Sequence, residues 1–190
     1  CQNELAQNPN NAELQFYLGT AYYLEENYTQ AIEWYTKSAN QGYAEAQNDL
    51  GMMYRDGRGI TQDYTKAHEL FVKSSNQGLD LAEYNLGVMY YFGMGIKQDE
   101  IHALEWFTKS ANQGFANAQF GLGMIYYLKQ DYTNALEWFT KSAEQEHFHA
   151  QAHLGMMYNN GHGIPKNPDT AKYWFAKACE NGYTKACQYR

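Results

Sequence analysis

The sequence lacks several features, and each absence excludes a class of protein. Lysine and arginine total 14 against 21 aspartate and glutamate residues, a formal net charge of −7. A protein that follows nucleic-acid phosphates needs clustered basic residues, so we expect no nucleic-acid partner. No apolar run approaches the roughly 20 residues that a membrane-spanning helix requires. No charged-then-apolar signal segment is present either, which leaves open that one has been removed.

Motifs typical of enzymes and metal sites are also absent. The chain contains neither G-x-S-x-G nor H-E-x-x-H. His149 and His153 lie four residues apart and could share a metal, but no acidic or cysteine residue has a matching spacing. Four serines recur at one position of the repeat described below, which argues against a single activated nucleophile: Ser38, Ser74, Ser110 and Ser142. We therefore expect no enzymatic activity, no cofactor and no metal.

What the sequence does contain is a repeat. Its register is marked by Gly19, Gly51, Gly87, Gly123 and Gly155, which are separated by 32, 36, 36 and 32 residues. A fixed period of this size is typical of a solenoid of helix pairs. Because each pair is too small to bury its own apolar face, the pairs stack. Such a chain usually presents a long surface, so binding is the expected function.

Each unit is predicted to be two helices, A and B. In the second unit, Ala46, Leu50 and Met53 fall at helical spacing, and Gly51 inside this helix A predicts close approach of helix B. Helix B follows a side chain that accepts hydrogen bonds from free N–H groups. These predicted caps are Asn27, Asp63, Asp99, Asp131 and Asn167.

Glycine punctuates the turns. Helix B is followed by Gly42, Gly78, Gly114 and Gly182, which suit a left-handed cap, but Glu146 occupies the same position in repeat four. Because positive φ is costly for a residue with a Cβ, we expect altered geometry there. The 36-residue units carry G-x-G triplets between helices A and B, such as Gly57-Arg58-Gly59. They follow helices rather than strands, so we interpret them as turns and not as phosphate-binding loops.

Together these units resemble the Sel1-like repeat, a relative of the tetratricopeptide repeat. The pattern reads Ala-x-Ala-Gln-x-x-Leu-Gly-x-x-Tyr, then Asp-Gly-x-Gly-Ile, then Asp-Tyr-x-x-Ala-x-x-x-Phe-x-Lys-Ser-Ala, then Gly-Tyr. Repeats two, three and five match the full form, and repeats one and four resemble the shorter tetratricopeptide turn. The resemblance covers roughly residues 9 to 190. It implies an all-α fold, an α/α right-handed superhelical solenoid of about five helix-pair repeats.

The resemblance also divides the chain. An N-terminal segment, interpreted as a lipoprotein linker and short capping helix, spans residues 1–11. The predicted repeats are 12–43, 44–79, 80–115, 116–147 and 148–183, followed by a partial helix A of a sixth repeat at 184–190. We expect a monomer that binds a protein or peptide partner.

In such repeats the A helices line a concave face, which the resemblance implies as the partner-binding groove. Aromatic residues are enriched at binding hot spots, and an arginine can pair with a carboxylate or stack on a ring. The candidate positions are Phe16, Tyr23, Asn48, Arg55, Tyr84, Tyr91, Phe120 and Tyr127. Repeat five contributes His149, Ala152, Met156 and Asn159 to the same face. The alternative is that some of these side chains pack between neighbouring A helices.

The cysteines are few, and two interpretations remain open for each group. Cys179 and Cys187, eight residues apart across a hairpin, resemble the disulfide of a cysteine-rich bacterial subgroup of the family; the alternative is two independent buried thiols. A disulfide would indicate an oxidising compartment. Cys1, followed by Gln2 and a polar stretch, resembles a lipidated bacterial lipoprotein, which would anchor the chain in the outer membrane; the alternative is a truncation point.

These observations predict a non-enzymatic scaffold of the bacterial envelope, facing the periplasm, that binds a partner protein or peptide in its groove. One alternative is an immunity protein that neutralises a secreted antibacterial effector, because the acidic surface would attract a basic partner. Another alternative, of a different class, is a β-lactam-binding or β-lactam-hydrolysing enzyme.

Overall fold

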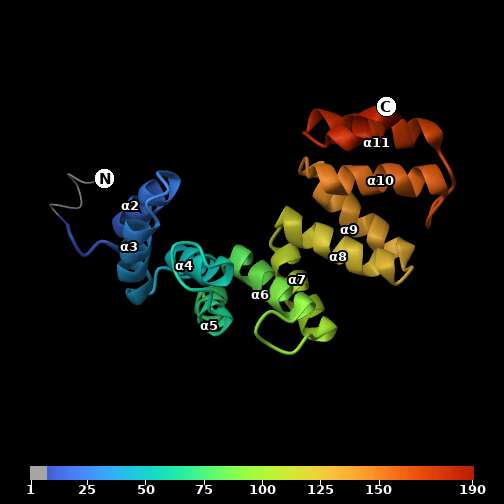
Figure 1. Ribbon diagram of the computed structural model, residues 1–190. Helices are drawn as coiled ribbons and strands as arrows, with labels where there is room; N and C mark the ends of the chain where they lie inside the picture. The colour runs from blue at the N-terminus through green and yellow to red at the C-terminus, as the bar shows by residue number, and fades with distance from the viewer. Residues whose placement is uncertain (1–7) are drawn as a thin grey trace. The chain divides into compact units, whose positions relative to one another are not determined.

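The computed structural model describes residues 8–190, which are all-helical with no strand over this range. Cys1 lies outside the described residues. Over these residues, ten α-helices follow one another and are succeeded by one 3₁₀ helix (Figure 1). The predicted all-α repeat of helix pairs is confirmed, whereas the handedness of the superhelix stays a prediction. No helix in this range is both long and apolar enough to cross a membrane.

The helices fall into two compact units. The first, up to Trp106, holds α2 (Ala12–Leu24), α3 (Tyr28–Asn40), α4 (Ala44–Asp56), α5 (Tyr64–Ser75), α6 (Asp80–Phe92) and the start of α7 (Glu100–Asn112). The second holds the rest of α7, then α8 (Ala116–Leu128), α9 (Tyr132–Glu144), α10 (Phe148–Asn160), α11 (Pro168–Glu180) and the 3₁₀ helix η1 (Thr184–Tyr189). Within the units, α2 pairs with α3, α4 with α5, α8 with α9 and α10 with α11.

The predicted caps start helix B as expected. Asp63 accepts a hydrogen bond from the Lys66 amide at 3.0 Å, and Asn167 accepts one from the Thr170 amide at 3.0 Å. Asn27, Asp99 and Asp131 do the same in their repeats. Each side chain satisfies an amide that has no partner inside the helix.

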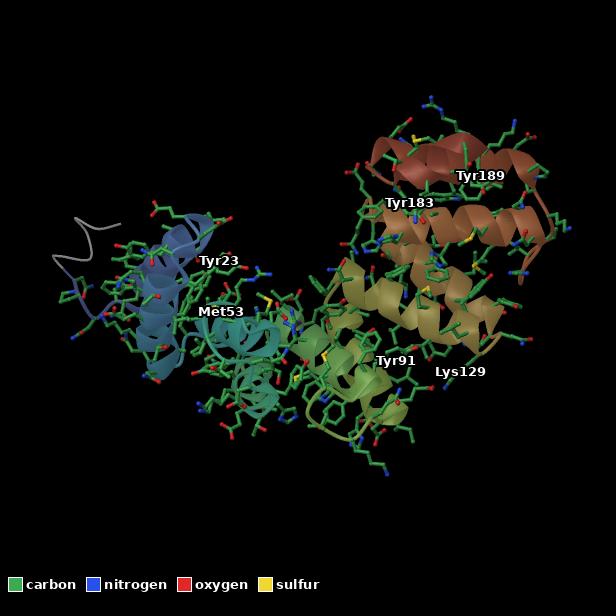
Figure 2. All side chains as sticks on the ribbon, viewed as in Figure 1. Tyr23, Met53, Tyr91, Lys129, Tyr183 and Tyr189 are labelled. Carbon is green, nitrogen blue, oxygen red and sulfur yellow. A yellow bond between two sulfur atoms is a disulfide. The ribbon has the colours of Figure 1, made fainter. Side chains whose placement is uncertain are left out.

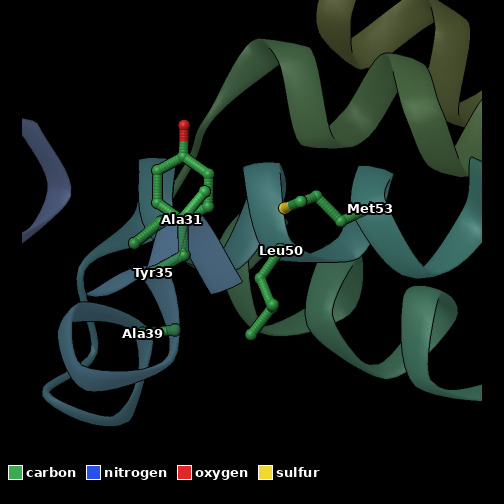
Figure 3. Close-up of a cluster of buried hydrophobic side chains, with 6 residues drawn as sticks. Ala31, Tyr35, Ala39, Leu50 and Met53 are labelled. Carbon is green, nitrogen blue, oxygen red and sulfur yellow. The ribbon is translucent and has the colours of Figure 1, made fainter. Parts of the chain in front are cut away.

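Glycine inside helix A allows an aromatic ring of helix B to lie against the backbone. A Cβ on Gly51 would stand 2.8 Å from the Phe71 ring, and one on Gly155 would stand 2.7 Å from Phe175. Gly19 faces Tyr35 in the same way, and Gly123 faces Phe139. The ring then packs into the core with the small residues beside it. Figure 3 shows Tyr35 with Ala31 and Ala39 of α3 against Leu50 and Met53 of α4.

Two features differ from the sequence-based expectation. Glu146 does not alter its junction: it takes φ +64°, and its amide bonds the Ala143 carbonyl at 3.0 Å, as the Gly42 amide bonds Ala39 at 3.0 Å. The cap bonds therefore outweigh the cost of a Cβ in the left-handed region. The segment after residue 183 is not a helix A. It winds as the 3₁₀ helix η1, which is bonded to α11 through a disulfide.

Candidate functional site

Among residues 8–190, two cavities open beside helix A positions of the predicted groove, one in each unit. A third cavity, of about 650 Å³, lies between the start of α2 and the end of α3 and contains none of the predicted groove positions. The first cavity, of about 330 Å³, lies among α2, α3, α4 and the turn after α4. It is lined by Thr20, Tyr23, Leu24, Tyr35, Asp49, Met52, Met53, Asp56 and Arg58. The second cavity, of about 520 Å³, lies among α10, α11 and η1. Both volumes fall in the range of small-ligand and side-chain pockets.

Asp49 is the unusual group of the first cavity. Burial raises the pKa of its carboxyl to about 6, although the hydrogen bond from Asn48 favours the charged form. The Asn48 amide donates to Asp49 Oδ1 at 3.0 Å. Burial also raises the pKa of Tyr35 to about 12, and its hydroxyl donates to Thr20 Oγ1 at 3.2 Å. A desolvated carboxyl in a cavity is characteristic of functional sites.

Asn48 connects Asp49 to a further chain of hydrogen bonds. Asn85 of α6 donates to Asn48 Oδ1 at 2.9 Å and accepts from an Arg55 terminal nitrogen at 2.8 Å. Arg55 also pairs with Asp56, with 2.7 Å between Nε and Oδ1. Asn48 is fully buried, so its prediction as an exposed groove contact is wrong. The reason is that α6 covers Asn48 and uses its oxygen as a hydrogen-bond acceptor, which helical spacing alone does not reveal.

Tyr23 lines the first cavity, on a helix A position that the sequence predicts to face the groove (Figure 2). The Arg58 guanidinium lies over the Tyr23 ring, 5.5 Å from its centroid, and donates to the Tyr23 hydroxyl. Arg58 belongs to the turn between helices A and B that only the 36-residue repeats contain. The turn therefore supplies a cation to the rim of the cavity, a role that the sequence-based prediction missed. A Gly-x-Gly turn with a charged middle residue was the available signal.

The other predicted groove residues of the first unit are partly covered. Phe16 packs against Tyr35 and Tyr43, with ring centroids 5.8 and 5.3 Å away. Burial raises the pKa of Tyr84. Tyr91 contacts Phe92 edge to face at 5.0 Å. The alternative of packing within the solenoid thus applies to Phe16, while the binding role of Tyr84 and Tyr91 stays a prediction.

In the second unit, Phe120 and Tyr127 lie within a group of histidines. The Phe120 ring centroid is 4.9 Å from that of His147, 5.8 Å from His149 and 5.4 Å from His153. Burial, reinforced by His149 nearby, lowers the pKa of His147 to about 4, and burial also lowers that of His153. Tyr127 shares a 2.8 Å hydrogen bond with His162 Nδ1.

The histidines do not assemble into a metal site. Among residues 8–190, no three His, Cys, Asp or Glu side chains lie together as a metal would need. His153 Nδ1 bonds the His149 carbonyl at 2.8 Å, and His147 Nδ1 accepts from the Ala150 amide at the start of α10. These imidazoles are therefore used in local structure and in packing against Phe120.

The second cavity contains none of the eight groove residues singled out from the sequence. Its helix A side consists of the repeat-five positions His149, Ala152, Met156 and Asn159, together with His153. Helix α11 contributes Pro168, Ala171, Lys172 and Phe175, and the C-terminal segment contributes Tyr183, Lys185, Ala186, Gln188 and Tyr189. The small alanines that make room for the cavity gave no signal, because alanine recurs at packing seams throughout the chain.

The recurring serines are structural. Ser38 Oγ donates to the Ala12 carbonyl at 2.6 Å, Ser74 Oγ to Ala44 at 2.8 Å and Ser142 Oγ to Ala116 at 2.8 Å. All of these serines, with Ser110, are fully buried. Each of the three bonds ties helix B to the first residue of its own helix A, so the hydroxyls are placed for packing rather than for attack on a substrate.

The sequence of the repeats identifies the family. A profile of the Sel1 repeat matches residues 44–79, 80–115 and 148–183, which are 108 of the 190 residues. The chain belongs to the Sel1 repeat family. A tetratricopeptide repeat profile matches residues 2–49 and 101–154, so this chain combines Sel1 repeats with tetratricopeptide-like ones. Repeats of both kinds bind protein partners.

Solved Sel1 repeat structures are similar. The Sel1 repeat protein from Oxalobacter formigenes is 30% identical over 93% of this chain and 74% of its own, with a TM-score of 0.86. The protein c5321, a protective antigen of uropathogenic Escherichia coli strains, is 36% identical over 96% of this chain with a TM-score of 0.81. This chain spans only 41% of that protein. The immunity protein PA5088 from Pseudomonas aeruginosa shares the fold at 22% identity over 89% of this chain and 67% of its own, with a TM-score of 0.64. A comparison with curated proteins finds no match.

Proposed function

We propose that this Sel1 repeat protein is a non-enzymatic scaffold that binds a protein or peptide partner through its helix A face. The observation that carries the proposal is the position of the two cavities. Both are lined on one side by helix A residues that the repeat register assigns to the groove, such as Tyr23 and Met156. Helix B contributes its recurring serines to the core, and its Tyr35 and Phe175 rings line the opposite sides of the two cavities.

The experiment is a selection of binding peptides from a displayed library, followed by alanine substitutions. Tyr23→Ala, Tyr91→Ala and Tyr127→Ala should weaken binding, about thirtyfold for a true anchor. The matched control is Tyr173→Ala, because Tyr173 lies on helix B α11 and is 54% exposed. If only the Tyr173 change abolishes binding, the partner contacts the opposite face and the proposal fails.

A second candidate is supported by charge. The formal net charge of −7 would accelerate association with a basic protein, and the immunity protein from Pseudomonas aeruginosa has the same fold. The partner would then be a secreted antibacterial effector. Co-expression with a basic effector encoded beside the gene should protect susceptible cells. If no neighbouring product binds the chain, this candidate is excluded while the scaffold proposal stands.

We also propose an oxidising compartment such as the bacterial periplasm. The support is the bond between Cys179 and Cys187, whose Cα atoms are 5.0 Å apart, because such bonds persist outside reducing cytosol.

A further inference from the structure

The second cavity is basic in an acidic protein. Lys172 of α11 and Lys185 of η1 line it, and no aspartate or glutamate does. Neither lysine forms an ion pair within residues 8–190. Lysines elsewhere on helix B do pair: Lys141 with Glu137 at 2.6 Å and Lys177 with Glu180 at 3.4 Å. Over the described part of the chain, two unpaired ammonium groups therefore face one opening.

The floor of the second cavity is apolar and has room for an aromatic ring. Ala152, Ala171 and Ala186 are buried around it, and Met156 lies alongside. Phe175 is 8% exposed, whereas its counterparts Phe71 and Phe139 in earlier repeats are fully buried. The difference arises because the 3₁₀ helix η1, not a further helix A, follows α11.

The wall opposite α10 is held in place before any ligand arrives. Cys187 lies between the lining residues Ala186 and Gln188 and is bonded to Cys179 of α11. The Tyr189 ring, labelled in Figure 2, lies 5.2 Å from that of Phe175. A site that is already ordered loses less conformational entropy when it binds.

From these three observations we infer that the second cavity binds an aromatic side chain of the partner protein that is flanked by acidic residues. The ring enters between Met156 and Phe175, and the carboxylates pair with Lys172 and Lys185. The inference rests on the proposed scaffold function and adds a chemical description of the partner. The charge of the opening favours an acidic segment over a basic one.

The test uses three short peptides and nuclear magnetic resonance of the intact oxidised protein, because weak binding is measurable by this method. Ac-Glu-Trp-Glu-NH₂ should shift the amide signals of α10, α11 and η1 residues at the cavity. Ac-Lys-Trp-Lys-NH₂ and Ac-Glu-Ala-Glu-NH₂ should bind at least about fivefold more weakly, because each lacks one of the two interactions. Equal shifts with the acidic and basic tryptophan peptides, or no shift at the cavity, would overturn the inference.

Charge substitutions give an independent measurement. The double variant Lys172→Gln, Lys185→Gln should bind the acidic tryptophan peptide about threefold to tenfold more weakly. Adding about 0.5 M salt should lower the affinity of the unsubstituted protein by a similar factor. The matched control is Lys177→Gln with Lys166→Gln, which removes two charges from residues outside the cavity lining. If the control weakens binding equally, the attraction is general and the cavity is not the site.

The outcome is separable from that of the scaffold proposal. A library-selected partner that is sensitive to Tyr23→Ala but not to the two lysine substitutions would leave the scaffold intact and remove this site. Reduction of the disulfide supplies a further check, because release of η1 should lower the affinity for the acidic tryptophan peptide. Unchanged affinity after complete reduction would show that η1 does not form the wall.

Discussion

At the scale of single residues, a repeat protein provides its own comparisons. Glu146 stands where four other repeats have glycine, and it also takes a positive φ, +64° against +83° to +105° for the glycines. Gly121 and Gly51 both lie in helix A, yet only at Gly51 would an added Cβ have a ring atom within 3.0 Å. Such pairs allow one physical effect to be measured with the rest of the environment nearly constant.

Replacing Glu146 by glycine should stabilise the protein by about 1 kcal/mol, because glycine adopts positive φ without the clash of a Cβ. Urea unfolding followed by circular dichroism measures the change. Glu146→Ala is the control, since it removes the charge and keeps the Cβ. If alanine stabilises as much as glycine, charge rather than backbone conformation explains the effect.

Gly51→Ala should destabilise the protein by about 1–2 kcal/mol, because overpacking exceeds the gain in helix propensity. The added methyl would lie 2.8 Å from the Phe71 ring, which is fully buried and cannot move aside. Gly121→Ala should instead be neutral or stabilising, since its nearest ring atom is 3.6 Å away. Calorimetric melting of both variants compares them, and the same sign for both would contradict the close-approach explanation.

The histidine at the start of α10 should make stability depend on pH. The folded-state pKa of His147 is about 4, below the ordinary value of 6.5, so the unfolded chain binds a proton that the folded chain does not. Stability should therefore fall as pH falls from 6.5 towards 4, by at most about 3 kcal/mol.

His147→Asn isolates this contribution, because asparagine can also accept the Ala150 amide. Urea unfolding at pH 7 and pH 4.5 should show a smaller loss of stability in the variant. Asp49, whose pKa is raised to about 6, acts in the opposite direction in both proteins. An identical loss in the two proteins would mean that His147 titrates normally.

At the scale of elements, much of the fold follows from the sequence. The helix caps Asp63 and Asn167 and the role of Gly51 are predictable from the sequence, because each depends on one local interaction. The end of the chain is not, because η1 depends on a bond between Cys179 and Cys187 and on Tyr189 packing against Phe175. The candidate site is predictable only in part: Tyr23 lies at a cavity, but the burial of Asn48 depends on Asn85 of α6, 37 residues away in sequence.

The disulfide should hold η1 against α11. Without reductant, alkylation and mass analysis should find Cys179 and Cys187 both blocked. Reduction should increase hydrogen exchange in residues 184–189 and lower stability by about 2–3 kcal/mol, as expected for a short closed loop. Two freely alkylated thiols in the non-reduced protein would contradict this prediction.

At the scale of the whole molecule, a solenoid lacks one shared core, so damage should remain local. Phe71 packs within the first unit against Leu86 and Met89. Phe71→Ala should cost about 3–5 kcal/mol where it occurs. Hydrogen exchange should then rise most in α4, α5 and α6 and least in α10 and α11, because each repeat contacts and stabilises only its neighbours. A uniform rise across residues 8–190 would indicate a single cooperative unit instead.

The bond from the buried serine to the first residue of helix A has a consequence for how such genes grow. Ser38 and Ser142 reach back 26 residues, and Ser74 reaches back 30, a difference equal to the four extra turn residues. Each of these copies carries both donor and acceptor of this bond. A duplicated segment of DNA that encodes one repeat would therefore also encode both partners of this hydrogen bond. Copies of 32 or 36 residues could then be added or lost without any new contact between helices A and B having to evolve.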